Sequence, residues 1–266
     1  MKILILGASY GSLLSTKLLM AGHDVTLICR SKSAALINDE GTEVRIKLRD
    51  EDSHRAFRSH DLAGTLDAVI PADARPEDYD MISLAMQEPQ YSEPQVRDLM
   101  QRIAASRKPC LSIMNMPPLP FLRRIDALAE VPLDMCYDDA SVWADFEPGL
   151  MSLCSPDPQA LRPPEEGTNI LHVGLPTNFK AAVFADPVHN AMLRQLESDI
   201  AAVTVDGKDV PVKLRIYDSL FVPMAKWSML LTGNYQCVQR DGVRAIRDAV
   251  HGDLAASAEM YAWVDT

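Results

Sequence analysis

The chain contains 266 residues, of which 47% are hydrophobic and 24% are charged, with 18 Pro and 12 Gly. This composition is typical of a globular protein and excludes a disordered or collagen-like chain. The length corresponds to one large domain or two smaller ones. The formal net charge of −11 argues against a protein that binds nucleic acid regardless of sequence, because that activity needs a positive surface.

The cysteines and the apolar runs indicate a cellular location. No C-x-x-C pair or metal-type spacing occurs among Cys29, Cys110, Cys136, Cys154 and Cys237, which favours unpaired thiols in a reducing compartment. The run at residues 2–6 is too short for a signal peptide, and no segment approaches the roughly 18 uncharged residues of a membrane span. We therefore expect a soluble cytoplasmic protein. The six histidines show no H-x-x-x-H or H-E-x-x-H, so we expect no metal site.

The first thirty residues predict a β-α-β unit. Residues 2–6 are continuously apolar after one lysine, as in a parallel strand that is buried on both faces. A glycine-containing turn follows, and then an amphipathic helix that Gly22 terminates. Residues 25–29 predict a second buried strand, which ends at Arg30.

The pattern of alternating strands and helices continues to residue 114. The expected elements are a helix from Ser31 through Ile37 that ends near Gly41, a half-exposed strand at 43–48, a buried strand at 79–86, a helix at 92–106 and a buried strand at 110–114. This alternation with short loops predicts a doubly wound α/β sheet.

Proline marks a change in the second half. It is absent from the first 70 residues, but five prolines fall between Pro148 and Pro164, which predicts a loop or linker. Residues 168–175 are predicted to be the last strand, followed by a connection at 176–187. The later apolar spacing is helical, with a kink near Pro223 in segment 212–238. We therefore expect an α/β domain over 1–176 and a smaller all-helical domain over 187–266.

The turn after the first strand is a candidate dinucleotide site. In the G-x-G-x-x-G turn, glycine lets the backbone approach a pyrophosphate, and free amides at the helix N-terminus hold its charge. The match here is imperfect, because Ser9 stands where a second glycine is expected and the loop is one residue short. A plain βα turn explains the pattern alone equally well, but its place between a strand and a capped helix favours a dinucleotide. The predicted contacts are Gly7, Ser9, Tyr10, Gly11 and Ser12.

Gly11 has a specific role in this hypothesis. We expect a Cβ at this position to crowd the pyrophosphate. On that basis Gly11→Val should abolish binding and leave the fold cooperative.

The end of the second strand indicates which dinucleotide binds. NAD enzymes usually have a carboxylate there for the ribose 2′-hydroxyl, whereas this chain has Arg30, followed by Ser31 and Lys32. A guanidinium can bind a 2′-phosphate bidentately. The alternative is that Arg30 and Lys32 are solvated loop residues. We expect NADP, with Arg30 and Lys32 beside the 2′-phosphate.

These segments together resemble the ketopantoate reductase family. The similarity is carried by residues 7–14, 21–30, 35–41, 79–86 and 112–115, and it covers residues 1–125 well and the rest in outline. The resemblance implies an N-terminal Rossmann domain followed by a helical domain, and an NADPH-dependent reduction of a 2-oxo acid.

The chain departs from the family at the positions that face the substrate. The family usually has Lys where this chain has Gln87, which we include among the cofactor contacts, and Gly where it has Met116. The family's catalytic Lys and Asn lie in W-x-K-L-x-x-N. Counted from Trp227, the matching positions are Met229 and Gly233, and Lys226 and Asn234 are out of register. The family's late Ser and Glu contacts would fall beyond Thr266.

Two residues are candidates for catalysis. Lys226 could donate to the carbonyl oxygen, because a one-turn shift would bring its long side chain to the position of Met229. Asn115, at the carboxyl end of a predicted strand, could orient the substrate or the ribose. The alternative for Lys226 is a surface lysine beside Trp227.

The sequence leaves three functions open. The first is an NADPH-dependent oxidoreductase that reduces a small carbonyl compound resembling a 2-oxo acid. The second is an NADP-binding sensor or scaffold, which the missing in-register Lys favours. The third is a dehydrogenase of the opine or 3-hydroxyacid type, which shares the two-domain plan. All three bind a small molecule and neither nucleic acid nor membrane, and a homodimer is one option for the assembly.

Overall fold

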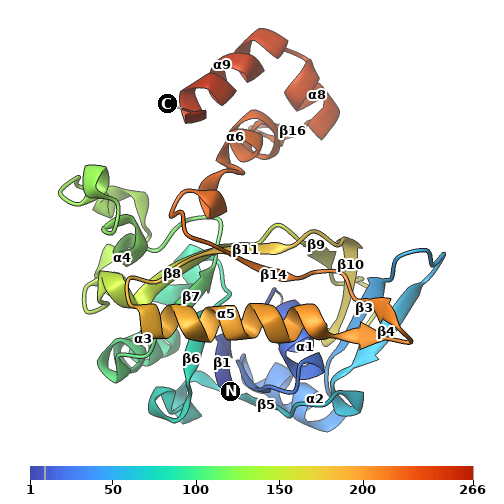
Figure 1. The fold of residues 1–266 in the computed structure, drawn as a ribbon. Coiled ribbons are helices and arrows are strands. Elements are labelled where there is room, and N and C mark those ends of the chain that lie inside the picture. The colour runs from blue at the N-terminus through green and yellow to red at the C-terminus, as the bar shows by residue number, and fades with distance from the viewer. Residues whose placement is uncertain (9, 266) are drawn as a thin grey trace. The chain divides into compact units, whose positions relative to one another are not determined.

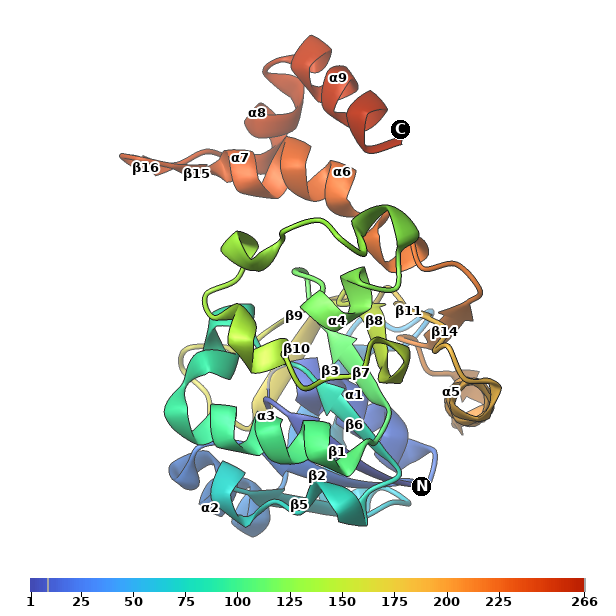
Figure 2. The same ribbon diagram turned by 90° about the vertical axis from the view of Figure 1, so that its left-hand side faces the viewer.

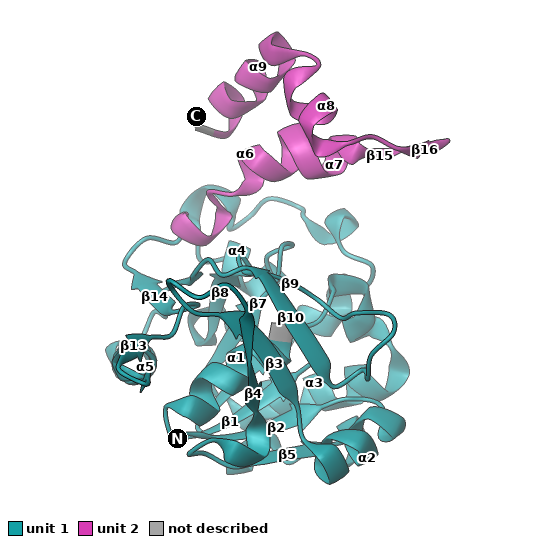
Figure 3. Cartoon of the chain, turned by 90° about the vertical axis from the view of Figure 1, so that its right-hand side faces the viewer, with its two compact units in different colours: residues 1–220 teal, residues 221–266 magenta. Residues whose placement is uncertain are grey.

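The structure is a computed structural model that describes residues 1–8 and 10–265. The chain divides into two compact units, Met1–Leu220 and Phe221–Thr266, which Figure 3 shows in teal and magenta. Each unit is described by itself below.

Unit 1 is built around an eight-stranded sheet (Figure 1). Its strands, in spatial order, are β14 (Leu214–Tyr217), β11 (Phe179–Ala182), β8 (Met151–Ser155), β7 (Cys110–Ile113), β6 (Met81–Leu84), β1 (Lys2–Leu6), β2 (Asp24–Ile28) and β5 (Leu66–Val69). The six strands from β8 to β5 are parallel, and β11 runs antiparallel to β8. Read from β5, the parallel strands follow the chain order 3-2-1-4-5-6 of the Rossmann fold. The predicted doubly wound fold is therefore confirmed.

Helices cover both faces of this sheet. They are α1 (Tyr10–Met20), α2 (Ser31–Glu40), α3 (Pro94–Ser106), the short α4 (Leu119–Leu122) and α5 (Pro187–Ala202). Helices α1 and α5 pack against each other on one face, and α3 lies on the opposite face (Figures 1 and 2). The stripe Leu99, Met100 and Ile103 of α3 is buried, as its helical spacing predicts.

A second, four-stranded sheet lies in the same unit. Its order is β4 (His54–Arg58), β3 (Glu43–Lys47), β10 (Ile170–Leu175) and β9 (Gln159–Leu161). Val44 and Ile46 of β3 are buried and their neighbours are more exposed, so the predicted half-exposed strand is confirmed. The strand expected at 168–175 is β10, but it pairs with β3 and not with the main sheet.

The proline-rich stretch is a correction to the sequence analysis, because it is not a linker. It contains β8, whose five residues are all buried within the main sheet. The prolines flank this strand and do not interrupt it. Ser152 makes the strand look polar in sequence, but its Oγ donates to the carbonyl of Ala182 at 2.5 Å, so burial costs little.

The sheet also continues past the expected domain boundary between residues 176 and 187. Strand β11 lies in the predicted connection and β14 in the segment predicted to be helical. Because both pair within the main sheet and α5 packs against β14, unit 1 extends to Leu220. The strand at 168–175 is therefore not the last one.

Unit 2 is mainly helical. It contains α6 (Trp227–Met229), a π-helical turn η10 (Leu230–Asn234), α7 (Tyr235–Cys237), a hairpin of β15 (Val238–Gln239) and β16 (Gly242–Val243), α8 (Ile246–His251) and α9 (Leu254–Asp265). At Pro223 the chain forms a 3₁₀ turn, η9 (Val222–Met224), where the sequence predicts a kinked helix. None of the helices in the described part of the chain has the length and apolarity needed to cross a bilayer.

Shorter elements complete unit 1. They are the hairpin of β12 (Thr204–Val205) and β13 (Lys208–Asp209) and the 3₁₀ turns η1 (Ser59–Asp61), η2 (Pro71–Asp73), η3 (Pro76–Asp78), η4 (Glu88–Ser92), η5 (Asp126–Leu128), η6 (Asp134–Cys136), η7 (Ala140–Trp143) and η8 (Pro148–Leu150).

Helix α1 carries a fully buried lysine. The Nζ of Lys17 donates to the carbonyls of Val210 at 3.3 Å and Pro211 at 3.0 Å, just before β14. The pKa of Lys17 is lowered from 10.5 to about 7, mainly by burial and also by the nearby Lys213, while Asp209 acts in the opposite direction. The ammonium is therefore close to losing its proton at neutral pH.

We predict that Lys17 makes the protein more stable as the pH rises from about 7 to 10.5. Between these values the unfolded chain binds the proton that the folded chain has lost. The free energy of unfolding therefore increases with pH, by at most about 1.4 kcal/mol per pH unit. Urea unfolding across this pH range measures the slope. Lys17→Met should flatten it, whereas Lys47→Met, at an exposed position of β3, should not. Equal slopes in wild type and Lys17→Met would contradict the prediction.

Candidate functional site

A cavity of about 970 Å³ opens at the carboxyl ends of β1, β2 and β6. Its walls include Gly7 and Ala8 after β1, Cys29 and Arg30 after β2, and Met86 after β6. The register pairs Leu6 with Ile28 and with Leu84, so these three ends lie at one edge of the sheet. In open α/β sheets, ligands bind where the strand order reverses, which here is between β1 and β6.

Gly7 is required by the turn that follows β1. Its φ is +100°, and a Cβ at this position would lie 2.6 Å from the carbonyl oxygen of Ala85. The Gly7 amide donates to the carbonyl of Ile28 at 3.0 Å. The turn is thus held between β2 and the end of β6, and any side chain would force them apart.

The role predicted for Gly11 is corrected by the structure. A Cβ at Gly11 would meet the Cγ2 of Ile5 at 2.9 Å and the Cδ2 of Leu27 at 3.7 Å. These atoms belong to the core, and Gly11 does not line the cavity. Its missing side chain therefore allows α1 to lie close to β1, which is the packing role of a glycine in such a turn.

The other predicted contacts of this turn have different outcomes. Ser9 lies outside the described residues, and of Tyr10 the structure describes the backbone, which begins α1. Ser12 is buried, and its hydroxyl donates to the carbonyl of Ala8. Ser12 does not line the cavity, so it stabilises the turn from the side that faces away from the cavity.

Arg30 borders the opposite side of the cavity. It follows β2 with an extended backbone and is the N-cap residue of α2. Arg30, Ser31 and Ser33 line the cavity, whereas Lys32 is exposed on the first turn of α2 and does not. No carboxylate occurs between residues 28 and 33.

The segment after β6 forms a further part of the wall. Met86 lines the cavity, and its amide donates to the hydroxyl of the fully buried Tyr91 at 3.1 Å. Burial raises the pKa of Tyr91, so this phenol stays protonated. Gln87 caps η4 through reciprocal hydrogen bonds with Gln90. It is Gln90, and not the predicted Gln87, that lines the cavity.

Arg162, which the sequence did not identify, follows β9 in the stretch predicted to be a linker. Its guanidinium lines the cavity, and Nη2 donates to the carbonyl of Ala8 at 2.5 Å. Cys29, expected in the core, also lines this cavity. Burial raises the pKa of its thiol, and Arg162 acts in the opposite direction. No local signal identifies Arg162, because only the pairing of β10 with β3 brings it to the turn.

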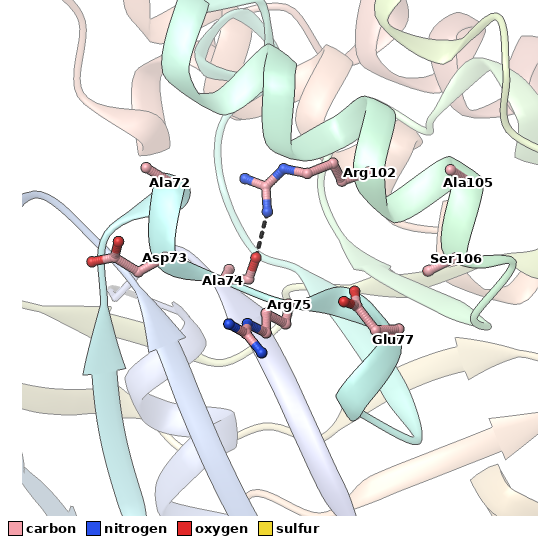
Figure 4. Close-up of a pocket in the computed structure, with 8 residues that line it drawn as sticks. All are labelled: Ala72, Asp73, Ala74, Arg75, Glu77, Arg102, Ala105 and Ser106. Atoms are coloured by element: carbon pink, nitrogen blue, oxygen red, sulfur yellow. Dashed lines mark hydrogen bonds between the residues drawn. The ribbon is translucent and has the colours of Figure 1, made fainter.

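A second cavity of about 800 Å³ lies beside α3 (Figure 4). Two arginines line it, the exposed Arg75 and Arg102, which donates to the carbonyls of Ala74 and, at 2.6 Å, of Pro71. Asp73 and Glu77 also line this cavity. Because the Arg102 guanidinium is engaged by the backbone and carboxylates stand nearby, this cavity is a poor site for an anion, and the cavity at Gly7 is the candidate.

The two predicted catalytic residues belong to different units. Asn115 lies in unit 1, two residues beyond β7, at the carboxyl edge of the sheet. Lys226 lies in unit 2, where it is the N-cap residue of α6 beside Trp227. Each keeps its predicted role as a proposal.

Unit 2 explains one of the departures at the catalytic positions. A Cβ at Gly233 would meet Val250 Cγ2 at 3.2 Å and Ile246 Cδ1 at 3.3 Å, so this position packs against α8 and has no room for a larger side chain. Gly233 lies in the π-helical turn, which accommodates one more residue than an α-helical turn. Because of this extra residue, Asn234 faces nearly the direction that residue 233 would face in an uninterrupted α-helix.

We predict that Gly11→Val destabilises unit 1 by about 1–3 kcal/mol, because the added methyl groups overpack the contact between α1 and β1. Gly7→Ala should be destabilising as well and should abolish dinucleotide binding, because the turn must move. Urea unfolding measures both effects. Gly174→Ala is the matched control, since its nearest contact is an ordinary 3.8 Å. A Gly11→Val protein with wild-type stability that fails to bind would restore the role predicted from the sequence.

Comparisons with known proteins agree with this fold. The chain resembles D-mandelate dehydrogenase with NADH and anilino(oxo)acetate, with a TM-score of 0.57 and 16% identity over 89% of this chain and 63% of that one. It also resembles a candidate ketopantoate reductase from Ralstonia solanacearum MolK2 (TM-score 0.62, 16% identity, 99% and 74% coverage). A third similar structure is 2-dehydropantoate 2-reductase from Methylococcus capsulatus (TM-score 0.54, 12% identity, 98% and 80% coverage).

The mandelate dehydrogenase is the longer protein, and the chain spans 63% of its length. No curated protein matches the sequence. The family model described as ketopantoate reductase PanE/ApbA matches residues 3–115, which contain β1, the glycine turn, β2, β6 and β7. Residues 3–115 are therefore similar to the ketopantoate reductase family.

Proposed function

We propose that the cavity at Gly7 binds NADPH and that the protein reduces a small carbonyl compound resembling a 2-oxo acid. The observation that supports this most is the pairing of a glycine turn on one wall with Arg30 on another, without a carboxylate between residues 28 and 33. The family of residues 3–115 and the NADH-bound mandelate dehydrogenase support a nicotinamide dinucleotide as the cofactor.

The residues around the cavity fit the parts of such a cofactor. The positive N-terminus of α1 and the turn at Gly7 offer a place for the pyrophosphate. The guanidinium of Arg30 offers paired donors to a 2′-phosphate, and the exposed Lys32 adds positive charge nearby. The cofactor supplies the hydride, and the protein positions the reactants.

The catalytic half of the proposal concerns Asn115 and Lys226. A carbonyl oxygen that gains negative charge needs a donor, and a positioned lysine supplies both charge and a proton. We assign this role to Lys226, and to Asn115 the orientation of the substrate at the carboxyl edge of the sheet. Asn234, the last residue of the π-helical turn, is a further polar residue of the same segment.

We predict that NADPH binds more tightly than NADH and that Arg30→Ala removes the difference. The lost contact is charge-assisted and is worth roughly 1.5–3 kcal/mol, about one to two decades in affinity. Fluorescence titration of both cofactors against both proteins measures this. Arg49→Ala, which removes a positive charge at an exposed position outside the cavity, should leave the preference intact. Equal affinities in the wild type would refute NADP specificity.

We predict that Lys226→Ala lowers turnover by roughly two decades or more and leaves the NADPH affinity unchanged, in line with typical acid–base contributions. A panel of 2-oxo acids, with and without amino acids, provides the assay and separates a simple reductase from an opine-type enzyme. Lys47→Ala is the control for the loss of a lysine. Unchanged turnover in Lys226→Ala would exclude a chemical role for Lys226. A wild type that binds NADPH but reduces no carbonyl would favour the sensor.

A further inference from the structure

Arg162 is held at the cavity by the second sheet. It directly follows β9, which pairs with β10, and β10 pairs with β3. The turn between β9 and β10 is fixed by Glu166, whose Oε2 forms an ion pair with Arg45 Nη2 at 2.8 Å. Asn169 donates to the carbonyl of Gly41 at 2.9 Å. The position of Arg162 is thus determined by tertiary contacts on both sides of the turn.

The guanidinium of Arg162 has N–H donors that its contact with Ala8 does not use. One of its N–H groups donates to the carbonyl of Ala8, and a guanidinium has five. Within residues 1–8 and 10–265, no carboxylate forms a salt bridge with it, unlike Arg45, Arg55 and Arg97. A cation that lines a cavity and has no carboxylate partner favours an anionic ligand there.

The contact with Ala8 has an electrostatic consequence for that ligand. A carbonyl oxygen at the glycine turn carries partial negative charge and would repel a phosphate placed beside it. Arg162 and Ser12 both donate to this oxygen, which offsets its charge. Because Arg162 lines the cavity, its remaining N–H groups are available to a ligand there.

We infer that Arg162 binds the pyrophosphate of the dinucleotide and forms a second guanidinium contact, separate from that of Arg30. This inference rests on the proposed function. The two arginines have different tasks, because the pyrophosphate is common to NADH and NADPH, whereas the 2′-phosphate is present only in NADPH. Arg162 therefore contributes affinity for both cofactors, and Arg30 contributes the preference between them.

The test is a titration of NADH and NADPH against wild type, Arg162→Met, Arg162→Lys and Arg30→Met. For Arg162→Met, the dissociation constants of both cofactors should rise by the same factor, about 10- to 100-fold, as expected for a charge-assisted contact. Arg162→Lys should recover part of this loss, since lysine keeps the positive charge but lacks the paired N–H donors of the guanidinium. Arg30→Met should weaken NADPH alone. Arg49→Met controls for the change in net charge, and thermal unfolding verifies the fold of each variant.

The possible outcomes separate this inference from the proposed function. If the wild type binds neither cofactor, the proposed function fails and the inference fails with it. If the wild type binds and Arg162→Met binds equally well or more tightly, the pyrophosphate contact is wrong while the proposed function stands. A loss confined to NADPH would also overturn the inference, because it would place Arg162 at the 2′-phosphate.

Discussion

The close approach of Gly7 to Ala85 is the contact on which the site depends. The chain can leave β1 at this point only without a side chain, since a Cβ would lie 2.6 Å from the Ala85 carbonyl oxygen. This passage sets the start of α1, and Gly11 then lets the helix settle against Ile5. The cavity wall and the carbonyl that Arg162 contacts both follow from this turn. The two glycines therefore act together, one on the path of the backbone and the other on helix packing.

A buried cation connects this helix to the far end of the sheet. Lys17 of α1 reaches the carbonyls of Val210 and Pro211, and Lys213 reaches the last carbonyls of α5 at Ile200 and Ala201. A lysine at the carboxyl end of a helix is stabilised by the helix dipole, which offsets part of the cost of burying its charge. The region after residue 176 is thus bound to α1, which explains why unit 1 does not end where the sequence predicted.

The sequence predicts well those elements whose burial is visible in their composition. Strands β1, β2, β6 and β7 are apolar on both faces, so their runs identify them and the order of the Rossmann sheet follows. Strand β8 is not predicted from the sequence, because the buried Ser152 is satisfied by a hydrogen bond to a distant carbonyl, which no local pattern reveals. The same limit applies to the site. The glycines predict where the turn lies, but only the packed structure shows that Gly11 faces the core and that Arg162, some 150 residues away, faces the cavity.

The segment after Trp227 shows how a local change of helix type can compensate for an offset in sequence. In the family's pattern six positions separate Trp from Asn, whereas seven separate Trp227 from Asn234. The π-helical turn at Leu230–Asn234 takes up one residue, while Gly233 provides the space that α8 occupies. Lys226 precedes this turn, so the extra residue does not compensate for the offset of Lys226. The turn therefore compensates for the offset of Asn234, its last residue, whereas the donor assigned in the proposed function, Lys226, lies before the turn. In the proposed function, cofactor binding and chemistry would be separable, because the Gly7 turn and Arg30 belong to unit 1 and Lys226 belongs to unit 2.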